Sequence, residues 1–329
     1  MPTGTVTVGE SPAPPPLAPW KNALAGASGG VVSRVVIAPL DVIKIRLQLQ
    51  TDVRQLAARV DPSAAKYTGV VQACSRILRE EGYRGLWKGN LSAEYLYLTY
   101  GAVQFYTYHE YSAFLHRIVS VCRSQLQLPL AGCTATVATY PFDLLRTRFA
   151  MQGASGGPYT SLLSAVRQIY AAEGVHGFYR GVVPSVLQMA PQMGIVFAAY
   201  GAIKGILKPL KVGLTGIRHI LRHENLIASL LGKTESFISG GIAGMLGKLS
   251  VMPFDVVRKR LQVQGPERNS YVTGRVPKYP SGLIRCAAQI ARQEGWLALY
   301  KGVVPALFKA GPSSAVTFAV VRIVSGALE

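Results

Sequence analysis

The chain has 329 residues, of which 49% are hydrophobic, only 16% are charged and 34 are glycine. A chain of this length ordinarily folds as two soluble domains, but few charges and glycine-rich apolar segments are typical of packed membrane helices. The formal net charge of +19 favours an anionic partner. Because the bases lie beside apolar spans rather than in one polybasic domain, an anionic membrane surface or substrate is favoured over nucleic acid.

Chemical motifs typical of enzymes are not recognisable in the sequence. We find no nucleophile–base constellation, no metal-binding cluster and no phosphate-binding glycine loop, so we expect neither an enzyme nor a cofactor nor a metal. The cysteines have no metal-ligand spacing and are too scattered for a disulfide framework: Cys74, Cys122, Cys133 and Cys286. Residues 1–19 are rich in Pro and Thr and lack Lys and Arg, which predicts a disordered tail rather than a targeting peptide.

Two linked motifs occur three times in the same order. The first is a proline with an acid two residues later and bases five and seven residues later, at Pro39, Pro141 and Pro253. The second begins with Glu (Glu-Gly in each copy) and ends in aromatic–base–Gly: EGYRGLWKG from Glu81, EGVHGFYRG from Glu173 and EGWLALYKG from Glu294. This order predicts three tandem repeats, over 20–122, 123–232 with a basic, irregular connector at 205–232, and 233–329.

Each repeat predicts two long apolar spans with a short amphipathic helix between them. In the first repeat the spans cover about 22–50 and 90–111, with the short helix at 70–78. In the second repeat a span begins at Ser124, a short helix covers 161–171, and residues 182–203 have no charge, which is long enough to cross a bilayer. The third repeat predicts spans at 236–264 and 303–324 with a helix at 281–292. We therefore predict an all-α membrane protein with six transmembrane helices in three hairpins and both termini on one side.

The chain resembles the mitochondrial carrier family, because the triplicated motifs cover residues 20–325. The resemblance implies a monomer in the mitochondrial inner membrane, built as a pseudo-threefold barrel with the short helices on the matrix side and both termini in the intermembrane space. Within the family, the similarity is strongest to members that carry thiamine pyrophosphate, in the stretches 41–50, 61–73, 144–153 and 259–265.

This resemblance implies a secondary transporter that imports thiamine pyrophosphate, and thiamine monophosphate, in exchange for nucleotides by alternating access. Two alternatives remain open. The chain is a carrier of another phosphorylated substrate, such as coenzyme A or an adenine nucleotide, or it is a membrane scaffold that transports nothing.

The motif acids and bases lie on one face of each first helix. Asp41, Lys44 and Gln48 are spaced i, i+3 and i+7, and this spacing alone also fits a local ion pair at a helix end. Three copies beyond three prolines favour a symmetric ring. By resemblance the ring is a matrix gate with the pairs Asp41–Arg146, Asp143–Arg258 and Asp255–Lys44, and Gln48 and Gln262 brace two of them. Ala150 stands at the third brace position.

The family's opposite gate is not recognisable here. The equivalent positions hold no acid: Tyr108, His109 and Ser112; Tyr200, Gly201 and Lys204; Val321, Arg322 and Ser325. We therefore expect a cytosolic side without salt bridges and a resting state that is closed toward the matrix.

Two further levels are expected to line the substrate cavity. Arg34, Thr136 and Lys248 lie seven residues before the motif acids, and Leu96, Gln188 and Lys309 lie seven residues after the motif glycines. Bases inside a membrane normally line a polar cavity, although snorkelling and structural pairing are alternatives. The cavity bases predict a diphosphate, with Glu94 or the face of Tyr95, Tyr97 or Tyr100 near its cationic ring. Met189 contacts a ring or only packs in the core.

The aromatic–base–Gly motifs open the second helix of each repeat, where free amides and the helix dipole favour phosphate. By resemblance they bind cardiolipin, and interfacial anchoring is a compatible role. The residues concerned are Trp87, Lys88 and Gly89; Tyr179, Arg180 and Gly181; Tyr300, Lys301 and Gly302.

Overall fold

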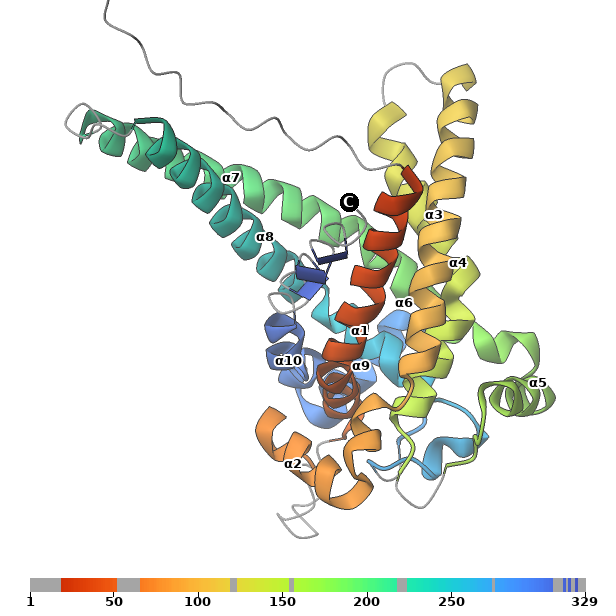
Figure 1. Ribbon diagram of the computed structural model, residues 1–329. Helices are drawn as coiled ribbons and strands as arrows, with labels where there is room; N and C mark the ends of the chain where they lie inside the picture. The colour runs from red at the N-terminus through yellow and green to blue at the C-terminus, as the bar shows by residue number, and fades with distance from the viewer. Residues whose placement is uncertain are drawn as a thin grey trace, which may run out of the picture.

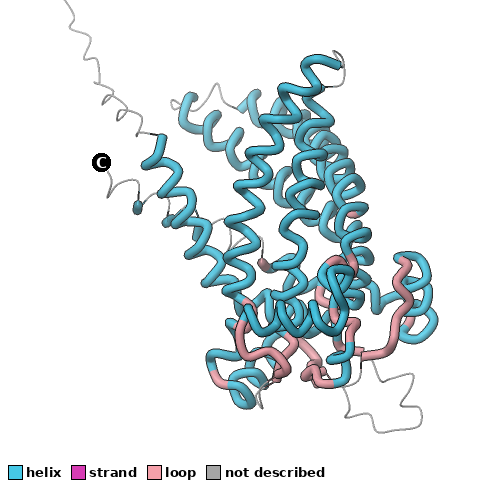
Figure 2. Tube along the Cα trace, turned by 90° about the vertical axis from the view of Figure 1, so that its right-hand side faces the viewer, coloured by secondary structure: helices cyan, strands magenta, loops and turns pink. Residues whose placement is uncertain are grey.

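The computed structural model describes residues 19–51, 66–118, 123–153, 157–217, 224–273 and 276–309, with short pieces within 316–324. Long helices occupy one end of the molecule, and the short helices and most loops gather at the other, here called the loop end (Figures 1 and 2). The tail predicted over residues 1–19 lies outside the described residues, apart from Pro19, which opens the first helix.

The three repeats have corresponding elements. Repeat one contains α1 (Pro19–Leu49), α2 (Val70–Glu81), the 3-10 helix η2 (Tyr83–Trp87) and α3 (Asn90–Ile118). Repeat two contains α4 (Arg123–Ala150), α5 (Leu162–Phe178), α6 (Val182–Leu187) and α7 (Met189–Ile217). Repeat three contains α8 (Glu224–Gln262), η4 (Pro266–Asn269), α9 (Leu283–Glu294), η5 (Trp296–Tyr300) and α10 (Val303–Phe308).

The structure changes one expectation about the spans and supports another in part. The connector over 205–232 is helical in its described parts, because α7 continues to Ile217 and α8 begins at Glu224; lysine is a good helix former, so a basic segment does not end a helix. Within the described chain, only Val182–Ile206 and Ser239–Gln262 are long and apolar enough to cross a membrane by hydropathy. Hydropathy therefore supports two of the six predicted spans.

The repeats pack through neighbouring long helices and a shared core. Helix α3 lies along α4, α7 lies along α8, and α1 contacts α3, α8 and α10. A hydrophobic core at the loop end joins the C-terminal parts of α1 and α8 to α2 and α9. The two short helices are amphipathic as predicted: α2 buries Ala73 and Ile77, and α9 buries Cys286 and Ile290.

The glycines of the second motif permit close contact between repeats. Within the described residues, every glycine with positive φ belongs to this motif, at its Glu-Gly or its final Gly position. A Cβ at Gly89 would lie 2.6 Å from the carbonyl oxygen of Arg146, and one at Gly302 would lie 3.3 Å from that of Lys44. At Gly181 the corresponding distance to the carbonyl oxygen of Arg258 is 3.0 Å. Each final glycine thus lets its repeat approach the backbone of a motif base in the next repeat.

We expect Gly89→Ala to destabilise the protein more than Gly82→Ala. Both glycines have a positive φ, in regions that cost another residue about 1–3 kcal/mol, but only Gly89 faces a backbone oxygen at 2.6 Å. Overpacking adds about 1–3 kcal/mol, so G89A should lose roughly twice as much stability or more. Thermal unfolding of the purified variants in detergent measures the difference, and equal losses in the two variants would contradict the close-contact explanation.

Candidate functional site

Three ion pairs join the three repeats in a cycle. Arg146 on α4 pairs with Asp41 on α1, Arg258 on α8 pairs with Asp143 on α4 at 2.8 Å, and Lys44 on α1 pairs with Asp255 on α8 at 3.0 Å. These are the three pairings expected from the sequence. All three acids are buried, so each needs a cationic partner to offset its lost hydration. The six residues are called the ion-pair ring below.

Each acid of the ring also binds a lysine as its second cation. Lys309, at the end of α10, lies 2.6 Å from Asp41 Oδ1. Lys248, two turns before Asp255 on α8, lies 2.5 Å from Asp255 Oδ2. The ring therefore contains acids shared between two cations rather than simple pairs.

The third acid, Asp143, binds a lysine that sequence analysis missed. Lys259 Nζ lies 3.2 Å from Asp143 Oδ2, 2.8 Å from Thr147 Oγ1 and 3.0 Å from Gln262 Oε1. The signal in the sequence was its position, since Lys259 stands where the first two repeats have Ile45 and Thr147.

The two predicted braces behave differently. The Gln262 amide donates to Asp143 Oδ2 and to the Tyr140 hydroxyl, as expected of a brace. The buried Gln48 amide has no hydrogen-bond partner among the described residues, so its predicted brace of the Asp255–Lys44 pair is wrong in this structure. Gln48 instead packs its side chain against Gly302.

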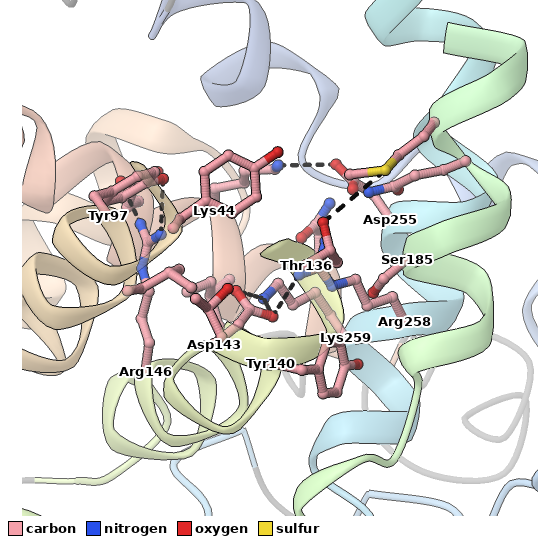
Figure 3. A pocket seen from close by; sticks show the side chains of 18 of the residues that line it. Lys44, Tyr97, Thr136, Tyr140, Asp143, Arg146, Ser185, Asp255, Arg258 and Lys259 are labelled. Atoms are coloured by element: carbon pink, nitrogen blue, oxygen red, sulfur yellow. Dashed lines mark hydrogen bonds and ion pairs between the residues drawn. The ribbon is translucent and has the colours of Figure 1, made fainter. Parts of the chain in front are cut away.

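A cavity of about 310 Å³ lies between the repeats, and the six residues of the ion-pair ring are part of its lining (Figure 3). Its lining includes six bases and three acids, an excess of three positive charges: Lys44, Arg146, Lys248, Arg258, Lys259, Lys309, Asp41, Asp143 and Asp255. The remaining wall carries hydroxyls, the Gln188 amide and the side chains of Leu96 and Met189. Such a cavity suits an anion with an organic part.

Most of the predicted substrate residues line this cavity. Leu96, Thr136, Gln188, Met189, Lys248 and Lys309 all do so. With its amide oriented to satisfy both partners, Gln188 donates to Asp255 Oδ1 at 3.1 Å and accepts from Arg258 at 3.2 Å. Met189 Sδ lies 3.7 Å from Cys133 Sγ and 3.9 Å from Thr136 Oγ1.

Arg34 and Glu94 are not among the residues that line this cavity, and their substrate role stays a prediction. The Arg34 guanidinium lies 3.4 Å from the ring centre of Tyr97, and Tyr97 itself lines the cavity and accepts a hydrogen bond from Arg146 at 3.3 Å. A desolvated guanidinium is stabilised on an aromatic face. Glu94 accepts from Asn90 one turn earlier, at 3.4 Å. Tyr100 lines the cavity, whereas Tyr95 stacks on Phe142.

The positions of the opposite network hold no described ion pair. Tyr108 contacts His109 edge to face, and the Lys204 amine lies 5.7 Å from the ring centre of Tyr200. Val321, Arg322 and Ser325 lie outside the described residues. The described ion pairs of the cavity thus all lie toward the loop end.

At the loop end, the Glu-Gly glutamates form three equivalent clusters. Glu81 binds Arg46 and Lys88, Glu173 binds Arg148 and Arg180, and Glu294 binds Arg260 and Lys301. The base of each aromatic–base–Gly motif also donates to a carbonyl oxygen just beyond the C-terminal end of the first long helix of the next repeat. These bonds run from Lys88 to Gln152, from Arg180 to Gln264 and from Lys301 to Gln50. The side-chain charges predicted to hold cardiolipin are therefore engaged in contacts within the protein.

The aromatic residues of these motifs also have protein partners. The Trp87 indole donates to the Val35 carbonyl at 2.9 Å, and Tyr179 stacks on Tyr140. Sequence analysis missed the three arginines of the clusters as functional partners. The sequence contained a signal for these clusters, because each proline motif has a second base, seven residues after the proline, and each second motif begins with a glutamate.

Comparison with known proteins divides the chain into the same three repeats. The family model described as "Mitochondrial carrier protein" matches residues 15–118, 129–211 and 231–328. The chain belongs to the mitochondrial carrier protein family. This membership makes it a membrane transporter rather than an enzyme.

Curated relatives from fungi match nearly the whole chain. A protein of Neurospora crassa is 41% identical over 309 residues, which cover 89% of this chain and 87% of the relative. A protein of Pyricularia oryzae is 43% identical over 309 residues, with 89% and 88% covered. A protein of Aspergillus terreus is 43% identical over 304 residues, with the same coverage. All three are named mitochondrial thiamine pyrophosphate carrier 1.

The glutamate clusters predict a loss of stability in acid. Burial opposes ionisation of Glu294, but hydrogen bonds and charge from Arg260, with the charge of Lys301, lower its pKa from 4.5 to about 2. The unfolded chain therefore binds the proton first, and the stabilisation present above about pH 4.5 is lost as the pH falls toward 2. Glu294→Gln should cost about 3–5 kcal/mol at neutral pH because it leaves Arg260 buried and unpaired.

The measurement is thermal unfolding of the two proteins between pH 7 and pH 3, and the stability gap between them should narrow as the pH falls. Glu80→Gln is the control, since Glu80 forms surface pairs with Lys66 and Arg76 and should cost less than about 1 kcal/mol. A gap that stays constant with pH would contradict the assignment of the low pKa to Glu294.

Proposed function

We propose that this protein imports thiamine pyrophosphate, and thiamine monophosphate, across the mitochondrial inner membrane in exchange for nucleotides. The excess of three positive charges at the base of the cavity carries this proposal, together with the names of the fungal relatives. A diphosphate supplies a similar amount of negative charge and several acceptor oxygens for lysine and arginine.

In this proposal the diphosphate end of the substrate binds near the ion-pair ring, and the organic rings of the substrate bind farther from it. Lys248 and Lys309 reach the phosphate oxygens, because both amines lie on the cavity wall and already bind carboxylates. Leu96, Tyr97, Tyr100 and Met189 give the organic rings an apolar and aromatic wall. The aromatic faces offset the positive charge of the thiazolium.

Alternating access follows from competition for the same cations. The ion-pair ring holds the repeats together on the side that the proposal assigns to the matrix. A bound phosphate draws Lys248 and Lys309 away from Asp255 and Asp41, so that substrate contacts replace ring contacts. The substrate therefore offsets the cost of opening the ring, and the empty carrier rests closed toward the matrix.

The proposed membrane arrangement completes the assignment. Six transmembrane helices form the pseudo-threefold barrel of one monomer, with both termini in the intermembrane space and the short helices in the matrix. Cardiolipin binds at the starts of α3, α6 and α10 through main-chain amides, because the side chains of the motif bases are engaged elsewhere.

Exchange in liposomes tests the proposed function. Purified protein is reconstituted into vesicles loaded with an adenine nucleotide, and uptake of labelled thiamine pyrophosphate is measured beside thiamine monophosphate, coenzyme A, ATP and unphosphorylated thiamine. We expect saturable uptake of the two thiamine phosphates that depends on the internal nucleotide. Preference for coenzyme A or ATP would reassign the substrate, and absence of any uptake would favour a scaffold.

We expect Lys248→Ala and Lys309→Ala to lower thiamine pyrophosphate uptake about 10- to 100-fold each, because a hydrogen bond to a charged group contributes about 1.5–3 kcal/mol. Arg292→Ala, at an exposed position on α9, is the matched control and should transport normally. Thermal unfolding checks that the variants are folded. Unchanged uptake by folded K248A and K309A would remove the phosphate role of these lysines.

A further inference from the structure

The ion-pair ring is not symmetric, because one of its three junctions has additional polar contacts. At the junction of α4 and α8, Lys259 binds Asp143, Thr147 and Gln262 in a buried position. Gln262 also accepts from Thr147 at 2.7 Å and donates to the Tyr140 hydroxyl at 3.0 Å. Figure 3 shows Lys259 and Asp143 directed toward each other among the residues that line the cavity.

The other two junctions cannot form this network. Where α4 and α8 use Tyr140, Thr147, Lys259 and Gln262, the junction of α1 and α4 has Ala38, Ile45, Thr147 and Ala150 at the matching positions. The junction of α8 and α1 has Met252, Lys259, Ile45 and Gln48, and the Gln48 amide makes no hydrogen bond among the described residues. Both weaker junctions involve α1.

The lysines that bind the ring acids as second cations also distinguish the junction of α4 and α8 from the two junctions of α1. Lys309 and Lys248 hold Asp41 and Asp255 from the cavity, where a substrate can reach them. Lys259 also lines the cavity, but its side chain is only 11% exposed, against 23% for Lys309 and 27% for Lys248, and it also donates to Thr147 and Gln262. Gln188, of repeat two, adds a link to Asp255 and Arg258 of repeat three. A phosphate in the cavity thus reaches the second cations at the two junctions of α1 more readily than it reaches Lys259.

We propose that Lys259 is a positioning residue that keeps repeats two and three together, so that the matrix side opens by movement of repeat one. This inference rests on the proposed transport function and deepens it, because it states which junctions the substrate releases. Repeats two and three then move as one body, and repeat one moves against them.

Distances between the three short helices test this order of opening. Val71, Leu163 and Ile284 are exposed and occupy the second position of α2, α5 and α9, so spin labels there report the three repeats equivalently. The labels are placed in pairs on the full chain without its native cysteines, after its uptake of thiamine pyrophosphate has been verified. Double electron–electron resonance in liposomes, with and without substrate, gives the three distances.

We expect substrate to shift the 71–163 and 71–284 distances and to leave the 163–284 distance unchanged. Lys259→Thr, which places the residue of repeat two at this position, should make the 163–284 distance shift as well. Lys259→Arg should restore the original pattern, because it keeps the charge. A merely structural role of Lys259 would not change which distance responds.

Equal shifts of all three distances in the protein with Lys259 would overturn this inference and leave the transport function standing. An unchanged 163–284 distance in folded K259T would also overturn it. If the labelled parent takes up no phosphorylated substrate and no distance responds, the proposed function fails and this inference fails with it.

Discussion

Buried aspartates that are shared between cations of different repeats hold this structure together. Each ring acid is removed from water at a cost of several kcal/mol, and its base from the next repeat offsets that cost. Because the acids and bases alternate around a cycle, no repeat can leave without exposing an unpaired charge. In the proposed mechanism the same contacts are exchanged for a phosphate, because a lysine donates hydrogen bonds to carboxylate and phosphate oxygens alike. Stability of the closed state and access of the substrate therefore depend on one set of charges.

The molecule separates exchangeable contacts from permanent ones. Within each repeat, a glutamate, an arginine and a second base form a buried cluster at the loop end, as in Glu294, Arg260 and Lys301. These clusters fasten the short helix to the long one, and they lie away from the cavity. Between repeats, contact depends on the ring pairs, on the backbone approach at the motif glycines, on the packing of α3 along α4 and α7 along α8, and on the shared hydrophobic core at the loop end.

The threefold symmetry of the repeats is broken at the cavity, where an asymmetric substrate requires different walls. Two cavity lysines, Lys248 and Lys309, come from repeat three, whereas Gln188 and Met189 come from repeat two and Leu96 and Tyr97 from repeat one. A molecule with a phosphate at one end and a ring at the other needs charge and apolar surface on different walls. The added network at Lys259 breaks the symmetry a second time, in the ion-pair ring that lines the cavity.

The sequence alone determined the three repeats and the residues that share one face of each motif helix, because both depend on spacing. The pairing partners in the ring and most cavity positions followed from its resemblance to the mitochondrial carrier family. It placed Leu96, Thr136, Gln188, Met189, Lys248 and Lys309 on the cavity wall, where they lie. The tertiary structure decided which partners certain side chains contact, because residue spacing in the sequence does not determine them. Arg34 stacks on Tyr97 beside the cavity, Gln48 has no hydrogen-bond partner among the described residues, and Lys259 reaches Asp143 on another helix. The physical reason is that a side chain's partner depends on the geometry between helices, whereas a repeat motif reports only the helix that carries it.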